Sequence, residues 1–286
     1  SGNAIGAAGD QFHYVWRDFV GPGTVVARVT GAAANSDGAP LPSSMSGLMI
    51  RDSAATTVPF VSLLHVPSEG LQMLCRDAVA TTALQVGSTI NLTPPYWMRL
   101  VRSNNTFRAY YSTTPNAPTP AEWVLIGSHA SGVTSDAIAG LAACSRDNTR
   151  LVTASFNAVA ITSPAEDWRH TWFGTVTNSG DAADDADPDQ DGVKNALERA
   201  FGSNPTMADN NRPVGRVAEG QFVLSYQRNL EATDLTYEVS WSTDLANWSI
   251  AGITDTAVSV ANSVEHREAV IGQSEGNPIF LRLIIK

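Results

Sequence analysis

The 286-residue sequence contains no apolar run that approaches the roughly 18 residues of a membrane-spanning helix. We therefore expect no membrane span. The sequence also has only two cysteines, Cys75 and Cys144. A single disulfide in an exported protein fits this count, and so do two buried thiols, and the sequence leaves both alternatives open.

Catalytic motifs are absent as well. The sequence has no Gly-x-Ser-x-Gly elbow, no His-Glu-x-x-His pair and no phosphate-binding loop. It also lacks the Glu-x-Asp-x-x-Glu strand with which concanavalin-like glycosidases place two carboxylates beside one bond. The five histidines are scattered, as framework histidines usually are. We therefore expect that the protein is not an enzyme.

Positive charge is scarce, and the formal net charge is −10. More than half of this excess comes from one cluster of aspartates within eleven residues: Asp181, Asp184, Asp185, Asp187, Asp189 and Asp191. Such a cluster favours a cation as the partner and argues against nucleic acid as the main ligand.

Residues 1–162 predict an antiparallel β-sandwich. Short runs rich in β-branched and aromatic residues alternate with clusters of Gly, Pro, Ser and Asn, which is typical of strands joined by turns. These runs are residues 24–30, 47–52, 58–66, 71–77, 122–128, 137–145 and 150–161. Residues 96–112 predict a hairpin that turns at Asn104 and Asn105. No helical periodicity interrupts the pattern, which favours a sandwich.

The pattern changes after residue 162. Residues 163–174 predict a short amphipathic or irregular connector, and residues 193–201 have helical character. Gly202 is placed to end that helix, and Pro205 blocks its continuation. Strand-like runs return after residue 209. We therefore expect a connector over 163–208 and a small β-sandwich of fibronectin-like size over 209–286.

The connector contains a calcium-loop pattern, "DPDQDGVKNALE", over residues 187–198. In a twelve-residue calcium loop, oxygen ligands come from positions 1, 3, 5, 7, 9 and 12, and position 6 is glycine. Gly192 occupies position 6. The predicted ligands are Asp187, Asp189, Asp191, the carbonyl of Val193, Asn195 (often through water) and Glu198. The sequence predicts no helix ahead of the loop, so we interpret it as half of an EF-hand that acts as a structural clip.

These stretches resemble a known architecture. "DWRHTWFG" and the loop that follows it are similar to a C-terminal cassette of exported Verrucomicrobia and Planctomycetes proteins with a thrombospondin type 3-like calcium loop. "DLTYEVSWSTDLANW" is similar to the small β domain that follows this cassette. "DQFHYVWRDFVGPGTVVARVT" and "SGLMIRDS" resemble a concanavalin A-like (laminin G-like) β-sandwich. The resemblance implies a secreted bacterial protein, extracellular or at the cell surface, with Ca²⁺ as its cofactor.

Three functions remain open. The first is carbohydrate binding or adhesion, since aromatic faces and polar side chains suit sugars. The candidate residues are Tyr14, Trp16, Arg51, Arg99, Tyr110 and Trp123. The second is a self-assembling subunit of an extracellular filament or surface layer, in which the amino end "SGNAIGAAGD" lies in a neighbouring copy's sheet. The third is an accessory part of a polysaccharide-active enzyme.

Overall fold

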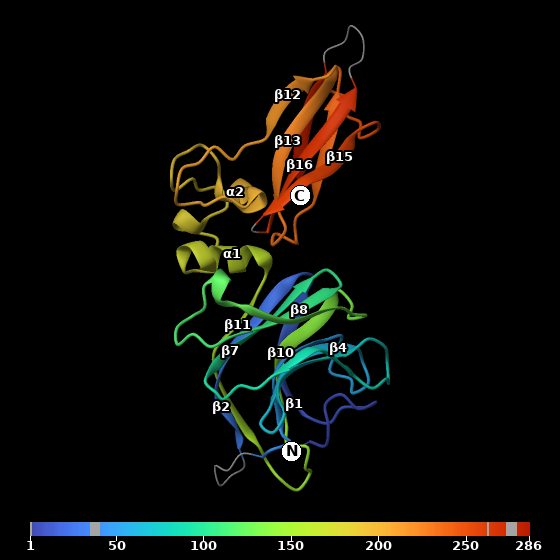
Figure 1. The fold of residues 1–286 in the computed structure, drawn as a ribbon, viewed down its shortest axis with the longest axis vertical. Coiled ribbons are helices and arrows are strands. Elements are labelled where there is room, and N and C mark those ends of the chain that lie inside the picture. The colour runs from blue at the N-terminus through green and yellow to red at the C-terminus, as the bar shows by residue number, and fades with distance from the viewer. Residues whose placement is uncertain (1, 35–40, 262, 273–278) are drawn as a thin grey trace. The chain divides into compact units, whose positions relative to one another are not determined.

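The computed structural model describes residues 2–34, 41–261, 263–272 and 279–286. The chain divides into two compact units, an N-terminal unit over Ser1–Ser163 and a C-terminal unit over Pro164–Lys286 (Figure 1). No helix among the described residues has the length and apolar character needed to cross a bilayer.

The N-terminal unit contains two antiparallel sheets, which supply the two layers of a sandwich. The six-stranded sheet contains, in spatial order, β1 (His13–Val20), β10 (Asp136–Cys144), β3 (Met45–Arg51), β4 (Phe60–Val66), β5 (Gly70–Arg76) and β6 (Leu84–Ile90). The five-stranded sheet contains β11 (Thr153–Thr162), β2 (Gly23–Ala34), β7 (Tyr96–Ser103), β8 (Thr106–Ser112) and β9 (Val124–Ala130).

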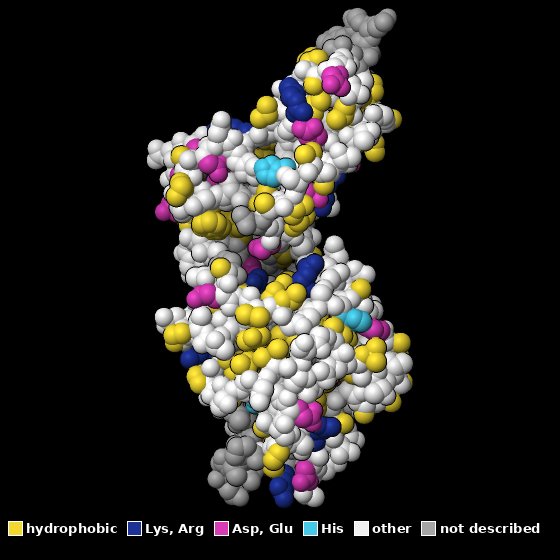
Figure 2. Space-filling view, viewed as in Figure 1, with side chains coloured by type: hydrophobic (Ala, Val, Ile, Leu, Met, Phe, Trp, Pro, Cys, Tyr) yellow, Lys and Arg dark blue, Asp and Glu magenta, His cyan; other side chains and the backbone are white. Residues whose placement is uncertain are grey.

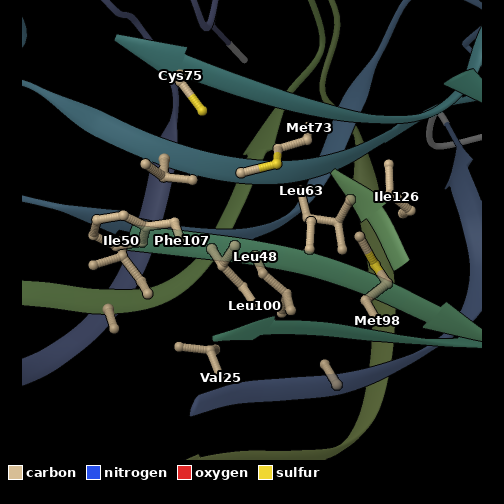
Figure 3. Close-up of a cluster of buried hydrophobic side chains, with 14 of the residues drawn as sticks. Val25, Leu48, Ile50, Leu63, Met73, Cys75, Met98, Leu100, Phe107 and Ile126 are labelled. Atoms are coloured by element: carbon tan, nitrogen blue, oxygen red, sulfur yellow. The ribbon is translucent and has the colours of Figure 1, made fainter. Parts of the chain in front are cut away.

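The core of this unit lies between the two sheets. Figure 3 shows Leu48 and Leu63 of the six-stranded sheet beside Met98 and Leu100 of the five-stranded sheet, and all four are fully buried. Alternate residues of each strand point into this layer, which is the period-2 pattern of a sandwich. The predicted mainly-β class and the antiparallel β-sandwich are confirmed.

The predicted hairpin is also confirmed. Strands β7 and β8 pair from Trp97↔Ser112 to Ser103↔Thr106, which leaves Asn104 and Asn105 as the two-residue turn. Asn104 has φ +56°, the left-handed conformation that asparagine tolerates better than most residues.

A second apolar layer covers the outer face of the six-stranded sheet. Strands β3 and β4 are buried along their whole length. The amino-terminal arm, residues 2–12, supplies part of this cover: Ile5 is buried in the cluster around Met49 and Phe60, and Phe12 packs against it. The arm therefore packs on the sheet of its own unit, where the filament hypothesis expected it in the sheet of a neighbouring copy.

Both cysteines lie in the described residues as buried free thiols, so there is no disulfide between them. Cys75 belongs to the inter-sheet core and Cys144 to the outer layer. Their strands β5 and β10 are three strand spacings apart, or roughly 14 Å, whereas a disulfide needs Cα atoms within about 7 Å. Of the two alternatives left open by the sequence, the disulfide is wrong.

The C-terminal unit begins with helical segments. These are α1 (Pro164–Phe173), a 3-10 turn at Gly180–Ala182 and α2 (Asn195–Phe201). Residues 164–173, expected as a short amphipathic or irregular connector, are thus α-helical. Helix α1 ends at Phe173, well before the loop at Asp187, so the helix that would open a complete EF-hand does not adjoin the loop.

Two small antiparallel sheets complete the C-terminal unit. The four-stranded sheet contains β12 (Val214–Ala218), β13 (Gln221–Asn229), β16 (Val264–Gly272) and β15 (Thr254–Ala261), and the two-stranded sheet contains β14 (Tyr237–Ser242) and β17 (Phe280–Ile285). Leu224 and Tyr226 of the first sheet share a buried cluster with Val239 of the second.

Helix α2 is anchored on these strands. The Tyr237 hydroxyl donates to the Ala200 carbonyl at 2.7 Å, and Asn229 Nδ2 donates to the Arg199 carbonyl at 2.8 Å. Arg199 also forms an ion pair with Asp234 at 2.8 Å. Gly202 ends α2 with φ +75°, as the sequence predicted, and its amide donates to the Glu198 carbonyl. The first turn of α2, which includes Glu198, is thereby held in a fixed position.

Candidate metal centre and ligand-binding residues

Three aspartates of the loop converge in the C-terminal unit. Each of Asp187, Asp189 and Asp191 offers a carboxylate oxygen, and these oxygens lie within 4.8 Å of one another. The loop turns through Gly192, whose φ of +88° suits glycine, as position 6 of the pattern requires. This group of carboxylates can hold a metal ion.

Buried oxygens without hydrogen-bond partners occur at further ligand positions of the same loop. Among the described residues, Asp187 Oδ1, Asp189 Oδ2, Asn195 Oδ1 and both carboxylate oxygens of Glu198 have no partner. Glu198 is only 1% exposed and Asn195 is 0% exposed. A buried carboxylate without a partner is costly, so such oxygens normally face a cation or a donor. These residues occupy positions 1, 3, 9 and 12 of the predicted loop.

The electrostatics of Glu198 agree with this convergence. Burial, followed by the charges of Asp189, Asp191, Asp209 and Asp187, raises the pKa of Glu198 to about 7. The pKa of Asp189 is also raised, by its own desolvation and by neighbouring carboxylates. Like charges held this close favour a cation between them.

Backbone amides fix the shape of the loop. The amide of Gly192 donates to Asp187 Oδ2 at 3.0 Å, that of Asp191 to Asp189 Oδ1 at 3.2 Å and that of Val193 to Asp191 Oδ1 at 2.7 Å. Each aspartate therefore uses one oxygen to shape the turn. For Asp187 and Asp189, the other oxygen is the unpartnered one.

Two hydrogen bonds orient the side-chain amide of Asn195. Its Nδ2 donates to the carbonyls of Asp181 and Ala183, both at 2.7 Å, which orients Oδ1 away from them. No local sequence pattern marks these two bonds, which tie the 3-10 turn to the start of α2. The remaining acids of the cluster lie outside the metal group: Asp184, for example, pairs with Arg169 at 2.7 Å.

Three of the six predicted ligand-binding residues meet in the N-terminal unit. Tyr14, Trp16 and Arg51 line one surface pocket of about 550 Å³, together with Phe12 and Asp10. Phe12, Tyr14 and Trp16 are alternate residues, so they lie on the same face of the chain as it enters β1. Trp16 is 47% exposed.

The other three residues lie on the five-stranded sheet and its border. Arg99 Cζ is 5.9 Å from the centre of the Tyr110 ring and 5.7 Å from that of Trp123. These are cation–π distances. The six predicted residues therefore form two groups on different sheets and do not make one common face.

Three further residues of these sites were not predicted from the sequence: Asp10, Phe12 and Asp209. The alternation of Asp10, Phe12, Tyr14 and Trp16 was the available signal for the first two. Asp209 lies beyond the twelve-residue loop pattern, which therefore does not mark it.

Charged side chains form no extensive basic surface among the described residues on the face drawn in Figure 2. Acidic and basic groups are scattered there, singly or in small groups, among hydrophobic and uncharged ones. This distribution differs from the basic patch of a nucleic-acid-binding surface.

No protein-family model and no curated protein matches the chain. Solved structures with a similar fold include a functionally unknown protein from Saccharomyces cerevisiae, 15% identical over 54% of this chain and 76% of that chain, with a TM-score of 0.39. They also include the carbohydrate-binding module CBM66 from Bacillus subtilis, which is 16% identical over 54% of this chain and 83% of that chain, with a TM-score of 0.38. A scytalido-glutamic peptidase is 13% identical over 53% of this chain and 81% of that chain, with a TM-score of 0.32. These likenesses concern part of the chain and do not extend to function.

Proposed function

We propose that residues 187–198 bind one Ca²⁺ ion, which acts as a structural clip in a non-catalytic, exported protein. The observation that carries the proposal is the group of Asp187, Asp189 and Asp191 oxygens within 4.8 Å of one another, together with unpartnered buried oxygens on Asn195 and Glu198 at later ligand positions of the same loop. Ca²⁺ takes six to eight oxygen ligands in flexible geometry, whereas Mg²⁺ keeps several of its waters. A loop that offers oxygens at six positions therefore suits Ca²⁺ better.

The contacts around the loop support the role of a clip. Asp191 Oδ2 accepts the amide of Asp209 at 3.2 Å, and the Arg212 guanidinium donates to the Asp191 carbonyl. Asn195 joins the turn before the loop to α2, and α2 packs on the C-terminal sheets. An ion at this centre would neutralise the repulsion among the carboxylates and stabilise residues 181–212 as one piece.

The resemblance to secreted proteins extends this proposal to the whole chain. In the proposed organisation of the chain, residues 1–162 form a concanavalin A-like sandwich and residues 209–286 form a small sandwich. The half-EF-hand connector over residues 163–208 lies between them in the sequence. Extracellular modules bind Ca²⁺ with Kd values of roughly 10⁻⁴–10⁻³ M, which suits a single loop without a paired partner.

A second candidate function is glycan recognition by the N-terminal unit. The pocket that contains Tyr14, Trp16 and Arg51 favours it, because aromatic rings contact sugar CH groups and a guanidinium binds oxygen atoms. The alternative of a filament subunit has no specific support from the contacts of the described residues. The amino-terminal arm, which that alternative would place in a neighbouring copy, packs on the sheet of its own unit.

Isothermal titration calorimetry tests the calcium proposal. The chelator-treated chain should bind one equivalent of Ca²⁺, and Asp189→Ala and Glu198→Gln should each weaken binding at least tenfold. Asp185→Asn is the matched control, because Asp185 belongs to the same acidic cluster but is exposed and stands outside the ligand positions. The proposal fails if the chain gives no binding heat, or if Asp185→Asn and Asp189→Ala weaken binding equally.

A further inference from the structure

Two arginines lie buried in one row on the outer face of the six-stranded sheet. Arg51 ends β3 and pairs with Phe60 of β4, which pairs with Arg76 of β5. Arg51 is 1% exposed and Arg76 is 0% exposed. The one fully buried carboxylate beside them is Asp10, which forms ion pairs with both. The group therefore holds two positive charges against one negative charge.

Arg76 is fully satisfied in this arrangement. Its Nη1 and Nη2 donate to the two oxygens of Asp10 at 2.9 and 2.7 Å. Its Nε donates to the Thr81 carbonyl at 2.8 Å, and Nη1 is also shared with the carbonyls of Thr56 and Val58 at 3.2 Å. Asp10 therefore forms its two-point ion pair with Arg76 and only a longer contact with Arg51.

Arg51 is not satisfied in the same way. Its Nη2 donates to the Ala55 carbonyl and lies 3.4 Å from Asp10, while Nη1 has only the Met49 sulfur, at 3.8 Å. Its Nε is buried and has no partner among the described residues. The Phe12 ring lies 5.0 Å from its Cζ. Burial lowers the pKa of Arg51, and the charges of Asp10 and Asp52 oppose this shift.

Among the described residues, no acid other than Asp10 forms an ion pair with Arg51. The charge of Asp52, the next residue, also acts on Arg51, but its Oδ1 accepts the Thr134 amide at 2.7 Å and the Thr134 hydroxyl at 3.1 Å. The Tyr14 hydroxyl donates to the carbonyls of Met49 and Ile138, and burial raises its pKa, so Tyr14 stays neutral. Arg51, which lines the pocket, therefore shares its one close carboxylate among the described residues, Asp10, with Arg76.

We infer that this pocket binds a sugar that bears a carboxylate, with the carboxylate next to Arg51 and the sugar ring against Trp16. The inference rests on the proposed glycan recognition and specifies its ligand class. A guanidinium and a carboxylate match in geometry, and a bound carboxylate would give Arg51 a partner that it does not share with Arg76. The exposed indole of Trp16 supplies a flat apolar face for the CH groups of the ring.

The test compares D-glucuronate with D-glucose, which has CH₂OH in place of the carboxylate, by NMR titration of the full chain at constant ionic strength. We expect glucuronate to bind at least tenfold more tightly and to shift the indole N–H signal of Trp16. Trp16→Ala should weaken glucuronate binding at least tenfold. Arg51→Met should remove the preference for glucuronate over glucose. Arg17→Gln is the control, because Arg17 is exposed on the opposite side of β1.

The outcomes separate the two levels of the proposal. If both sugars bind equally well and Trp16→Ala abolishes this binding, glycan recognition is supported but the inference of a carboxylate-bearing sugar is wrong. Acetate that binds as tightly as glucuronate overturns the sugar part. If glucuronate does not bind, or binds equally well to Trp16→Ala, the inference is wrong. Trp16→Ala and the comparison of the two sugars decide the question even if Arg51→Met does not fold.

Discussion

Asp10 and Arg76 form a buried two-point ion pair in the N-terminal unit. Arg76 Nη1 lies 2.9 Å from Asp10 Oδ2, and Nη2 lies 2.7 Å from Oδ1. Both side chains are completely excluded from solvent. The pair joins the amino-terminal arm to the end of β5 and so holds the apolar cover on the outer face of the sheet.

Asp10→Asn should lower the free energy of unfolding of the N-terminal unit by about 3–5 kcal/mol, because it leaves two buried guanidinium groups without a counter-charge. Urea unfolding of the full chain measures this change. Asp18→Asn, on the exposed part of β1, is the control and should change the unfolding free energy by less than about 0.5 kcal/mol. A loss below about 1 kcal/mol for Asp10→Asn would contradict a stabilising ion pair.

Gly202→Ala should destabilise the C-terminal unit more than Gly220→Ala does. Both glycines have a left-handed φ, +75° and +73°, so both substitutions carry a backbone cost of about 1 kcal/mol. A Cβ on Gly202 would also lie 2.6 Å from Val264 Cγ2, whereas a Cβ on Gly220 meets nothing within 4 Å. Thermal unfolding of the two variants compares them. Equal melting temperatures would contradict the close approach of Gly202 to the Val264 side chain.

The stability of the N-terminal unit should fall as the pH drops below about 6.5, the ordinary pKa of histidine. His65 is 3% exposed, its Nδ1 lies 2.6 Å from Tyr96 Oη, and burial lowers its pKa. Below this pH, His65 therefore binds a proton more tightly in the unfolded chain than in the folded chain. Each tenfold difference in this affinity can lower the free energy of unfolding by about 1.4 kcal/mol. Stability is retained above pH 6.5 and declines between that pH and the lower pKa of the folded state.

Urea unfolding between pH 5 and 8 checks this expectation, together with NMR titration of the imidazoles. His65→Gln should flatten the pH dependence, whereas His13→Gln, at an exposed position, should leave it unchanged. If the His65 ring titrates at or above pH 6.5 in the folded protein, the prediction is wrong.

Both cysteines should resist alkylation in the folded protein. Burial raises the pKa of Cys75 to about 12, with a contribution from Asp77, and it also raises that of Cys144. The thiolate is the reactive form, so almost none is available near neutral pH. Mass spectrometry after iodoacetamide treatment should find both thiols unmodified when native and both modified in denaturant. A mass that shows an oxidised pair, or a melting temperature lowered by reductant, would contradict free thiols.

The strands and the loop were predictable because their signals are local. Asn104 and Asn105 mark a hairpin turn, and the spacing of Asp187, Asp189 and Asp191 around Gly192 is sufficient to predict that their carboxylates converge. The same holds for Gly202, where a helix must end in a left-handed residue.

Other features depend on contacts between distant residues. The separation of Cys75 from Cys144 follows from strand order, which neither stretch encodes by itself. The grouping of Tyr14 and Arg51 apart from Arg99 likewise needs the two sheets to be known. Helix α1 was missed because Pro164 begins a stretch whose apolar residues form no clear stripe.

Hydrogen exchange with and without Ca²⁺ tests the calcium clip most directly. On addition of Ca²⁺ to the chelator-treated chain, backbone amides of residues 181–212 should gain protection, and the C-terminal unit should melt at a higher temperature. A ligand at 100 times its Kd stabilises the folded state by about 2.7 kcal/mol. The N-terminal unit should not change, and Asp189→Ala should abolish both effects. Unchanged exchange in residues 181–212 together with an unchanged melting temperature would contradict the clip.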